Sequence, residues 1–324
     1  MIDQLQFQAL GAWNEIHPGK SKPQALDHLL QSRDYIIVFW FERGSKSGEP
    51  VLISKIPRTQ NFNRYAERSI KLVNRLLADL NPPIRETLPT RVIAGQVGSL
   101  THIVMGYMPG EPITIPNDNF LGRRAAEKHL SAFLAWLVEF QAQATLDTRV
   151  VPWDEFFKRS QEGPGLDFLG GDPYQRITQQ IVSHLPIADI PYTWGFGDAN
   201  HSNILMEQGQ ISGAIDWIGV EQEQWFYTDW YYFLFFYAFE FFKKNSKASL
   251  DTKRRSAIST TMGIGDHWLT RLFAEKTLQF LASRSTDPQL NPELFLTFLH
   301  DLHWPQGKGQ LIKEAYSIYS QARD

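Results

Sequence analysis

The chain has 324 residues, of which 43% are hydrophobic and 21% are charged, and its formal net charge at pH 7 is −3. This composition is typical of a soluble globular protein, and the length allows one large domain or two ordinary ones. The slightly acidic balance provides no basic field for nucleic acid, so we expect no nucleic-acid partner. The chain contains no cysteine, which excludes disulfides and thiol chemistry.

The first residues lack a basic segment followed by an apolar core, so the sequence predicts no signal peptide and a cytoplasmic protein. The most apolar run spans residues 225–242 and contains Asp229 and Glu240. It is too short and too polar to span a lipid bilayer, so we expect a buried helix and no membrane partner.

The residues before Tyr35 give the weakest pattern. Residues 19–21 read Gly-Lys-Ser, but the remainder of a phosphate-loop motif is absent, so a turn is predicted there. The continuous apolar and aromatic run Tyr35–Phe41 predicts a buried strand. A hairpin turn at residues 43–48 leads to a partner strand at residues 51–55, which closes on Lys55.

Apolar residues then recur with helical spacing, up to the two prolines at residues 82–83, which end the helix. Strands are predicted at residues 88–94 and 102–105, followed by a Pro-Gly turn at residues 106–110. Beyond that turn the pattern becomes helical. The buried face of a long helix is expected to consist of Leu130, Phe133, Leu134, Leu137 and Phe140.

The most informative stretch is residues 194–217. Two short apolar runs, 204–206 and 211–215, flank a turn containing Gly209, which predicts a β-hairpin. Such a hairpin brings Asp198, Asn203 and Asp216 together. Carboxylate and amide oxygens are ligands that Mg²⁺ prefers, and Asp198 is left to accept a proton from an attacking hydroxyl. The arrangement favours phosphoryl transfer.

The order Asp198-x4-Asn203, followed by Asp216 between Ile215 and Trp217, resembles the catalytic core of the aminoglycoside phosphotransferase and choline kinase family. That family has a protein-kinase-like fold. In it the first Asp is the catalytic base, and the Asn and the second Asp hold the metal. The resemblance therefore implies Asp198 as base, Asn203 and Asp216 as metal ligands, ATP and Mg²⁺ as cofactors, and a small-molecule hydroxyl as acceptor.

The resemblance also implies a nucleotide site. Lys55 would reach the α- and β-phosphates, although a solvent-facing strand end is the alternative. Glu67, on the helix that follows, would hold Lys55 or else be an ordinary exposed helix residue. The segment at residues 106–110 would be the hinge that binds adenine through backbone groups. The nucleotide contacts implied around it are Met105, Tyr107 and Leu205.

We therefore expect a two-lobed α+β fold of the protein-kinase-like type, with a small sheet lobe at residues 1–110 and a larger, mainly helical lobe at residues 111–324. Asp229 is expected to brace the active-site loop or to cap a helix. Residues 300–303, His-Asp-Leu-His, are interpreted as a solvated turn, because so short a pattern is a weak metal signal.

Three departures from the family pattern concern activity. Phe196 stands where the family usually has His, and Asn200 stands where it usually has a second His. Residues 29–34, before the strand at Tyr35, contain no glycine to let backbone approach the phosphates closely. The alternatives left open are a catalytically inert, kinase-shaped nucleotide-binding protein and a helical structural protein without a nucleotide site. The sequence leaves the acceptor, the choice between ATP and GTP, and the oligomeric state open.

Overall fold

The computed structural model of this chain describes residues 2–20, 23, 25–31, 35–41, 49–144, 179, 192–217, 223–284, 291–301 and 308–323. The chain packs into two compact units. The first contains Met1–Pro112, Phe196–Asp198 and Asn203–Gln222, and the second contains Ile113–Gly195, Ala199–Ser202 and Glu223–Asp324. A segment from the middle of the sequence thus belongs to the N-terminal unit, whereas the sequence predicted a single boundary after residue 110.

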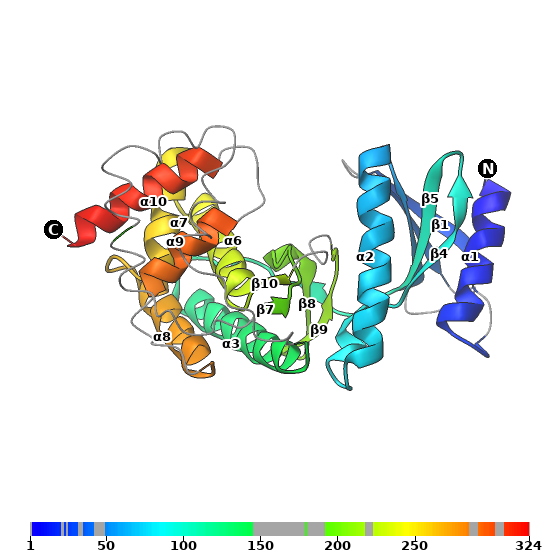
Figure 1. Cartoon of the computed structure of the whole chain (residues 1–324), viewed down its shortest axis with the longest axis horizontal. Coiled ribbons are helices and arrows are strands. Elements are labelled where there is room, and N and C mark those ends of the chain that lie inside the picture. The colour runs from blue at the N-terminus through cyan, green and yellow to red at the C-terminus, as the bar shows by residue number, and fades with distance from the viewer. Residues whose placement is uncertain are drawn as a thin grey trace. The chain divides into compact units, whose positions relative to one another are not determined.

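The first unit is built on an antiparallel sheet of five strands in the order β1-β2-β3-β5-β4, which lies between the helices α1 and α2 (Figure 1). A smaller sheet pairs β6, β8 and β9. The elements of this unit are α1 (Ile2–Ile16), β1 (Ala25–Gln31), β2 (Tyr35–Phe41), β3 (Pro50–Pro57), α2 (Gln60–Asp79), the 3-10 helix η1 (Arg85–Thr87), β4 (Arg91–Val97), β5 (Leu100–Gly106), β6 (Glu111–Pro112), β8 (Ile204–Glu207) and β9 (Gln210–Ala214).

Each face of the five-stranded sheet packs on one helix. Because side chains alternate along a strand, Leu52 and Val104 lie on one face and contact Trp13 of α1. Ile103 lies on the opposite face and contacts Ile70 of α2. Lys55 pairs with Ile103 in the register of β3 and β5, so its side chain also lies on the face that carries α2.

A buried polar chain joins α1 to its face of the sheet. His102 is fully buried, and its two ring nitrogens lie 2.9 Å from Gln8 Oε1 and 2.9 Å from Ser54 Oγ. The indole N–H of Trp40 donates to the same Ser54 oxygen at 2.7 Å. Since Gln8 Oε1 can only accept, His102 Nδ1 carries the proton and Nε2 accepts from the Ser54 hydroxyl. With a neutral His102 ring, each of its two nitrogens forms a hydrogen bond of the correct direction.

Acid is therefore expected to destabilise the protein through His102. Burial lowers the pKa of His102 from 6.5 to about 4, so between these pH values the unfolded chain binds a proton that the folded chain does not. The contribution of neutral His102 to the free energy of unfolding is fully present above pH 6.5. It decreases as the pH falls, by up to about 1.4 kcal/mol per pH unit for one such group. Urea unfolding at pH 7 and pH 5 measures this loss, and it should be smaller in His102→Gln. Equal losses in the two proteins would contradict the assignment.

The second unit is mainly helical. Helix α6 packs against α7 and α9, α3 packs against α8, and α10 packs against α7 and α9 (Figure 1). The elements are α3 (Phe120–Gln143), β7 (Tyr192–Trp194), the 3-10 helix η3 (His201–Asn203, which ends in the first unit), β10 (Glu223–Trp225), α6 (Thr228–Asn245), α7 (Leu250–Thr261), α8 (Trp268–Ala282), α9 (Asn291–Asp301) and α10 (Lys308–Arg323).

Aromatic side chains form the core of the second unit. Phe133 of α3 is fully buried and stacks on Phe233 of α6, with ring centroids 4.0 Å apart. Trp230 of α6 stacks on Phe280 of α8 at 5.2 Å, which continues the stack between helices. Although this makes α6 strongly apolar, no helix in the described residues has the length and apolar character needed to cross a membrane.

The α+β fold with a smaller sheet unit and a larger helical unit is confirmed, but one local prediction is wrong and one of the two alternatives for Asp229 is excluded. His300 does not lie in a solvated turn: it is buried in α9 and lies 2.8 Å from the hydroxyl of Tyr316. Asp229 does not cap α6, because Tyr227 is the N-cap residue and Asp229 lies buried in the first turn. The predicted turn at residues 43–48 and the loop residues 32–34 lie outside the described residues.

Candidate active site

The predicted hairpin is formed by β8 and β9, in which Ile204 pairs with Ala214. The pairing continues past the strand ends, where the N–H of Ile215 donates to the carbonyl of Asn203 at 2.8 Å. Asn203 and Asp216 therefore leave the same end of the hairpin as neighbours. The two chain positions are therefore neighbours, and the convergence of their side chains stays a prediction.

Asp198 joins them through Asn203. The amide nitrogen of Asn203 donates to Asp198 Oδ2 at 2.9 Å and to the Asp198 carbonyl at 3.2 Å. Gly197, with φ of 80°, makes the turn that precedes Asp198, a conformation that glycine adopts without steric cost. Asn203 Oδ1 makes no hydrogen bond within the described part of the chain, so it remains available as an oxygen ligand.

Asp216 binds Lys55. The Lys55 ammonium forms an ion pair and hydrogen bond with Asp216 Oδ1, and it lies 5.6 Å from the centre of the Tyr35 ring. Asp216 has φ of 61°, a left-handed conformation that is uncommon for residues other than glycine. Backbone strain of this kind clusters at functional sites, where the surrounding structure fixes it.

The charges around Asp216 favour its carboxylate form. Burial opposes ionisation, but the charge and hydrogen bond of Lys55, together with the charge of Arg91, bring the pKa of Asp216 below its usual value. Arg91 begins β4 and is buried, and burial lowers its pKa to about 10 although Asp216 and Tyr35 act in the opposite direction. It therefore stays protonated at neutral pH, and two cations face one carboxylate.

Glu67 does not hold Lys55 in this structure. Its carboxylate accepts a hydrogen bond from the hydroxyl of Thr101 and another from the amide of Asn63 at 3.1 Å. Glu67 and Lys55 form no hydrogen bond or ion pair among the described residues, and Lys55 pairs instead with Asp216. The alternative of an ordinary exposed helix residue also fails, since Glu67 is half-buried.

At the start of the proposed hinge, residues 106–110, the first two backbone N–H groups are already hydrogen-bonded. The N–H of Gly106 donates to the Thr90 carbonyl at 3.1 Å, and that of Tyr107 donates to the Val51 carbonyl at 3.2 Å. The first N–H of the segment with no hydrogen bond in the described part of the chain belongs to Met108. If adenine binds here, this amide is the available donor.

Two of the implied nucleotide contacts are buried apolar side chains. Met105 lies on β5, on the same face of the sheet as Lys55, and Leu205 lies on β8. Gly110, with φ of 107°, brings the chain so close to β8 and β9 that a Cβ would overlap Ser212. The Ser212 hydroxyl also donates to the Pro109 carbonyl at 2.8 Å, which fixes the hinge segment to the hairpin.

Phe196, which replaces the usual His, has a packing role. It is fully buried and meets Trp217 edge to face, with ring centroids 4.6 Å apart. The indole N–H of Trp217 donates to the Ala214 carbonyl at 2.7 Å. The two rings therefore brace the segments that carry Asp198 and Asp216, and this aromatic contact supplies local order without a histidine.

Arg91 is the functional candidate that the sequence did not reveal. An arginine at the start of a strand is usually exposed, and nothing in its neighbours along the chain distinguishes it. Its register opposite Met105 places it on the face of the sheet that carries Lys55. Only the folded sheet shows that a second cation acts on Asp216.

The phosphotransferase enzyme family model matches residues 38–232. The matched region covers more than half of the chain and includes Lys55, Asp198, Asn203 and Asp216. The chain belongs to the phosphotransferase enzyme family. This confirms the family expected from the sequence motif. No curated protein matches the chain.

Solved structures of phosphotransferases are similar to this family member at low identity. The ADP-bound aminoglycoside phosphotransferase APH(2'')-Ib is 13% identical, with 95% of each chain covered and a TM-score of 0.49. The GDP and kanamycin complex of APH(2'')-IIIa is 13% identical, with 98% of each chain covered and a TM-score of 0.49. The macrolide 2'-phosphotransferase MphH from Brachybacterium faecium is 13% identical, with 97% of each chain covered and a TM-score of 0.48. Such identities leave the substrate of this phosphotransferase family member open.

Proposed function

We propose that this protein transfers the γ-phosphoryl group of ATP to a hydroxyl of a small molecule in a Mg²⁺-dependent reaction. The observation that carries the proposal is the junction of two side-chain pairs within the first unit. Asp198 is hydrogen-bonded to Asn203, Lys55 is paired with Asp216, and the backbone bond from Ile215 to Asn203 joins the two pairs. These are the residue types that phosphoryl transfer requires.

The donor set fits a magnesium ion. Asn203 Oδ1, which has no hydrogen bond from the described residues, and the carboxylate of Asp216 offer two hard oxygen ligands from adjacent positions. Mg²⁺ in nucleotide sites takes one or two protein ligands and completes its octahedron with phosphate oxygens and water. When bound, the ion would neutralise charge on the transferred phosphoryl group.

The remaining residues bind the nucleotide and orient the attacking hydroxyl. Asp198 accepts the proton of the attacking hydroxyl, and its hydrogen bond from Asn203 keeps its carboxylate oriented. Lys55 and Arg91 contribute positive charge to a partly buried site, where nucleotide phosphates supply the matching negative charge. Leu205 and Met105 provide apolar surface for the adenine ring, and the Met108 amide provides a donor.

A second candidate function is an inert nucleotide-binding protein. The observation that favours it is the engagement of Glu67 by Thr101 and Asn63, which leaves Lys55 without the acidic helix partner of an active kinase-like site. In that case Lys55 and Arg91 would still attract nucleotide phosphates, but no transfer would follow.

The test is ATP consumption by the purified protein with a panel of small alcohols, including amino sugars, amino alcohols and simple sugars. The proposal expects ADP formation above the acceptor-free rate with at least one compound, and a new phosphate ester in the ³¹P spectrum. A thermal shift with MgATP but no product on any acceptor supports the inert alternative. The absence of any nucleotide-dependent shift contradicts both candidates.

A further inference from the structure

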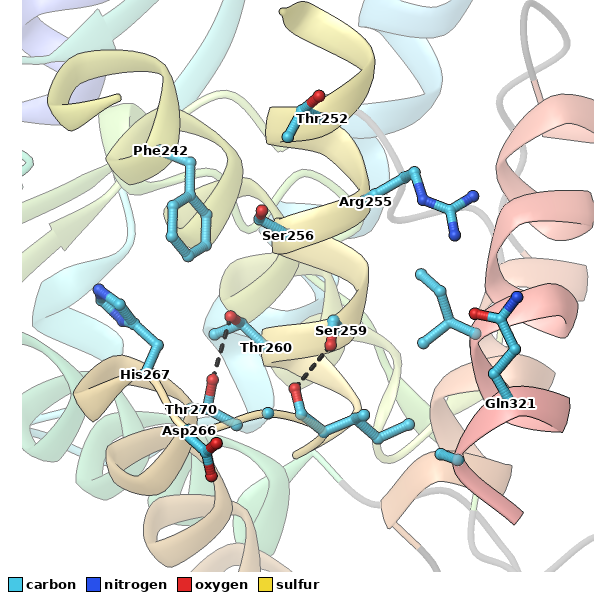
Figure 2. A pocket seen from close by; sticks show the side chains of 14 residues that line it. Phe242, Thr252, Arg255, Ser256, Ser259, Thr260, Asp266, His267, Thr270 and Gln321 are labelled. Carbon is cyan, nitrogen blue, oxygen red and sulfur yellow. Dashed lines mark hydrogen bonds between the residues drawn. The ribbon is translucent and has the colours of Figure 1, made fainter. Parts of the chain in front are cut away.

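A cavity of about 640 Å³ is lined entirely by residues of the second unit and by none of the residues proposed for catalysis (Figure 2). It is lined by 14 residues from the end of α6, from α7, from the turn between α7 and α8, from the start of α8 and from the end of α10. The family match ends at residue 232, before all of these residues. Its volume lies within the range of ordinary small-molecule sites.

Hydrogen bonds fix the floor of the cavity. The Ser259 hydroxyl donates to the carbonyl of Ile264 at 2.6 Å, and the hydroxyls of Thr260 and Thr270 lie 3.2 Å apart (Figure 2). His267 accepts from the N–H of Leu269 through Nδ1 at 3.1 Å, which holds its ring at the start of α8. The turn between α7 and α8 is therefore held in place, and the cavity does not need to be organised by a ligand.

Four other polar side chains that line the cavity are exposed or half-buried and make no hydrogen bond with the rest of the described residues. Arg255, Ser256, Asp266 and Gln321 line it, and in the described residues none of these four side chains makes a hydrogen bond or an ion pair. Figure 2 shows them distributed over the walls, with Arg255 extending from α7 toward α10 and Asp266 in the turn below. They are available to a ligand.

Arg254, the residue before Arg255, is by contrast hydrogen-bonded within the fold. Arg254 donates to both carboxylate oxygens of Glu314, at 2.8 and 2.6 Å, and so fastens α10 to α7. Burial opposes ionisation of Glu314, but the hydrogen bonds from Arg254 and Gln310 bring its pKa below the usual value, with a smaller contribution from the charges of Arg254 and Arg255. Arg254 therefore links α7 to α10, whereas Arg255 lines the cavity.

The chemistry of the walls defines the ligand. Arg255 can only donate and carries a positive charge, so it matches a carboxylate or phosphate. Ionised Asp266 can only accept, so it requires hydrogen-bond donors on another part of the same ligand. Ser256 and Gln321 accept or donate, and Phe242 and Ile318 offer apolar surface to a carbon framework. A compound with one anionic group and several hydroxyls satisfies all of these groups.

We propose that this cavity binds a small polyhydroxylated anion, a sugar phosphate or a sugar acid, with the anionic group on Arg255. The site is independent of the proposed phosphotransferase activity. It does not use Asp198 or Asp216, and its ligand need not be the phosphoryl acceptor.

Isothermal titration calorimetry with four probes tests the proposal: glucose 6-phosphate, glucuronate, glucose and inorganic phosphate. At least one of the two charged sugars is expected to bind at least tenfold more tightly than glucose and than inorganic phosphate, and the tighter one identifies the anionic group. Arg255→Gln should weaken this binding at least tenfold. Lys253→Gln, a charge removal two residues earlier on α7, should leave it unchanged.

Two further variants keep the test decisive. Asp198→Asn should retain the binding, because Asp198 does not line the cavity. Ser256→Leu should weaken it, because it removes a hydroxyl from the wall and puts a larger apolar side chain in its place. The proposal is overturned if no charged sugar binds below about 10 mM, if Arg255→Gln binds like the parent, or if inorganic phosphate or neutral glucose binds as tightly as the charged sugars.

Discussion

Asp198→Asn is expected to lower kcat by about 10²–10⁴-fold at saturating acceptor, which is the usual contribution of a general base. An amide has the shape of the carboxylate and can still accept the hydrogen bond from Asn203, so the loop is expected to keep its geometry. What it loses is the ability to take a proton. Binding of MgATP should therefore stay within about twofold of the parent.

Single-turnover kinetics and a separate nucleotide titration measure the two effects. Asp79→Asn is the matched control, because it makes the same chemical change at an exposed position near the end of α2 and should leave kcat unaltered. A parent with clear phosphotransfer whose Asp198→Asn variant turns over equally fast would show that another group accepts the proton.

Asp216→Asn is expected to abolish the effect of Mg²⁺ on nucleotide binding without weakening the binding of free ATP. Asparagine tolerates the left-handed backbone at this position, so the substitution tests charge rather than strain. Removal of the carboxylate leaves Lys55 and Arg91 without their shared anion, and metal-free ATP should bind as tightly as in the parent or more tightly.

Thermal shifts with ATP alone and with MgATP separate these contributions, since a ligand stabilises the folded state according to its own dissociation constant. In the parent, Mg²⁺ should increase the shift. In Asp216→Asn it should add nothing, whereas the shift with ATP alone persists. A variant that still gains stability from Mg²⁺ to the same extent as the parent would rule out Asp216 as the metal ligand.

Much of the first unit could be predicted because its elements carry strong periodic patterns. The strand Tyr35–Phe41 has the predicted limits, and the apolar spacing before the two prolines correctly indicated α2. Helix α1 was missed, because part of its buried face consists of small residues such as Ala9 and Ala12. These contribute little to a hydrophobic pattern but allow close approach to the sheet.

The candidate site could be predicted only in part. The motif located Asp198, Asn203 and Asp216, because a short hairpin brings its two ends together by local geometry. The partner of Lys55 could not be predicted, because sequence spacing does not determine toward which residue of the sheet the Glu67 side chain points. Thr101, on a strand distant in sequence, takes that carboxylate. Arg91 depends likewise on the assembled sheet.

The pair formed by Lys55 and Asp216 joins positions 161 residues apart, and the unit that contains it is interrupted in sequence by parts of the other unit. During synthesis the ribosome completes the five strands of the main sheet long before it reaches the hairpin. The growing N-terminal segment therefore exposes an unpartnered Lys55, and the proposed site is assembled only after more than two hundred residues have been made. For the same reason, an exchange of residues 1–112 between relatives would transfer Lys55 but leave the proposed metal ligands, Asn203 and Asp216, with the host chain.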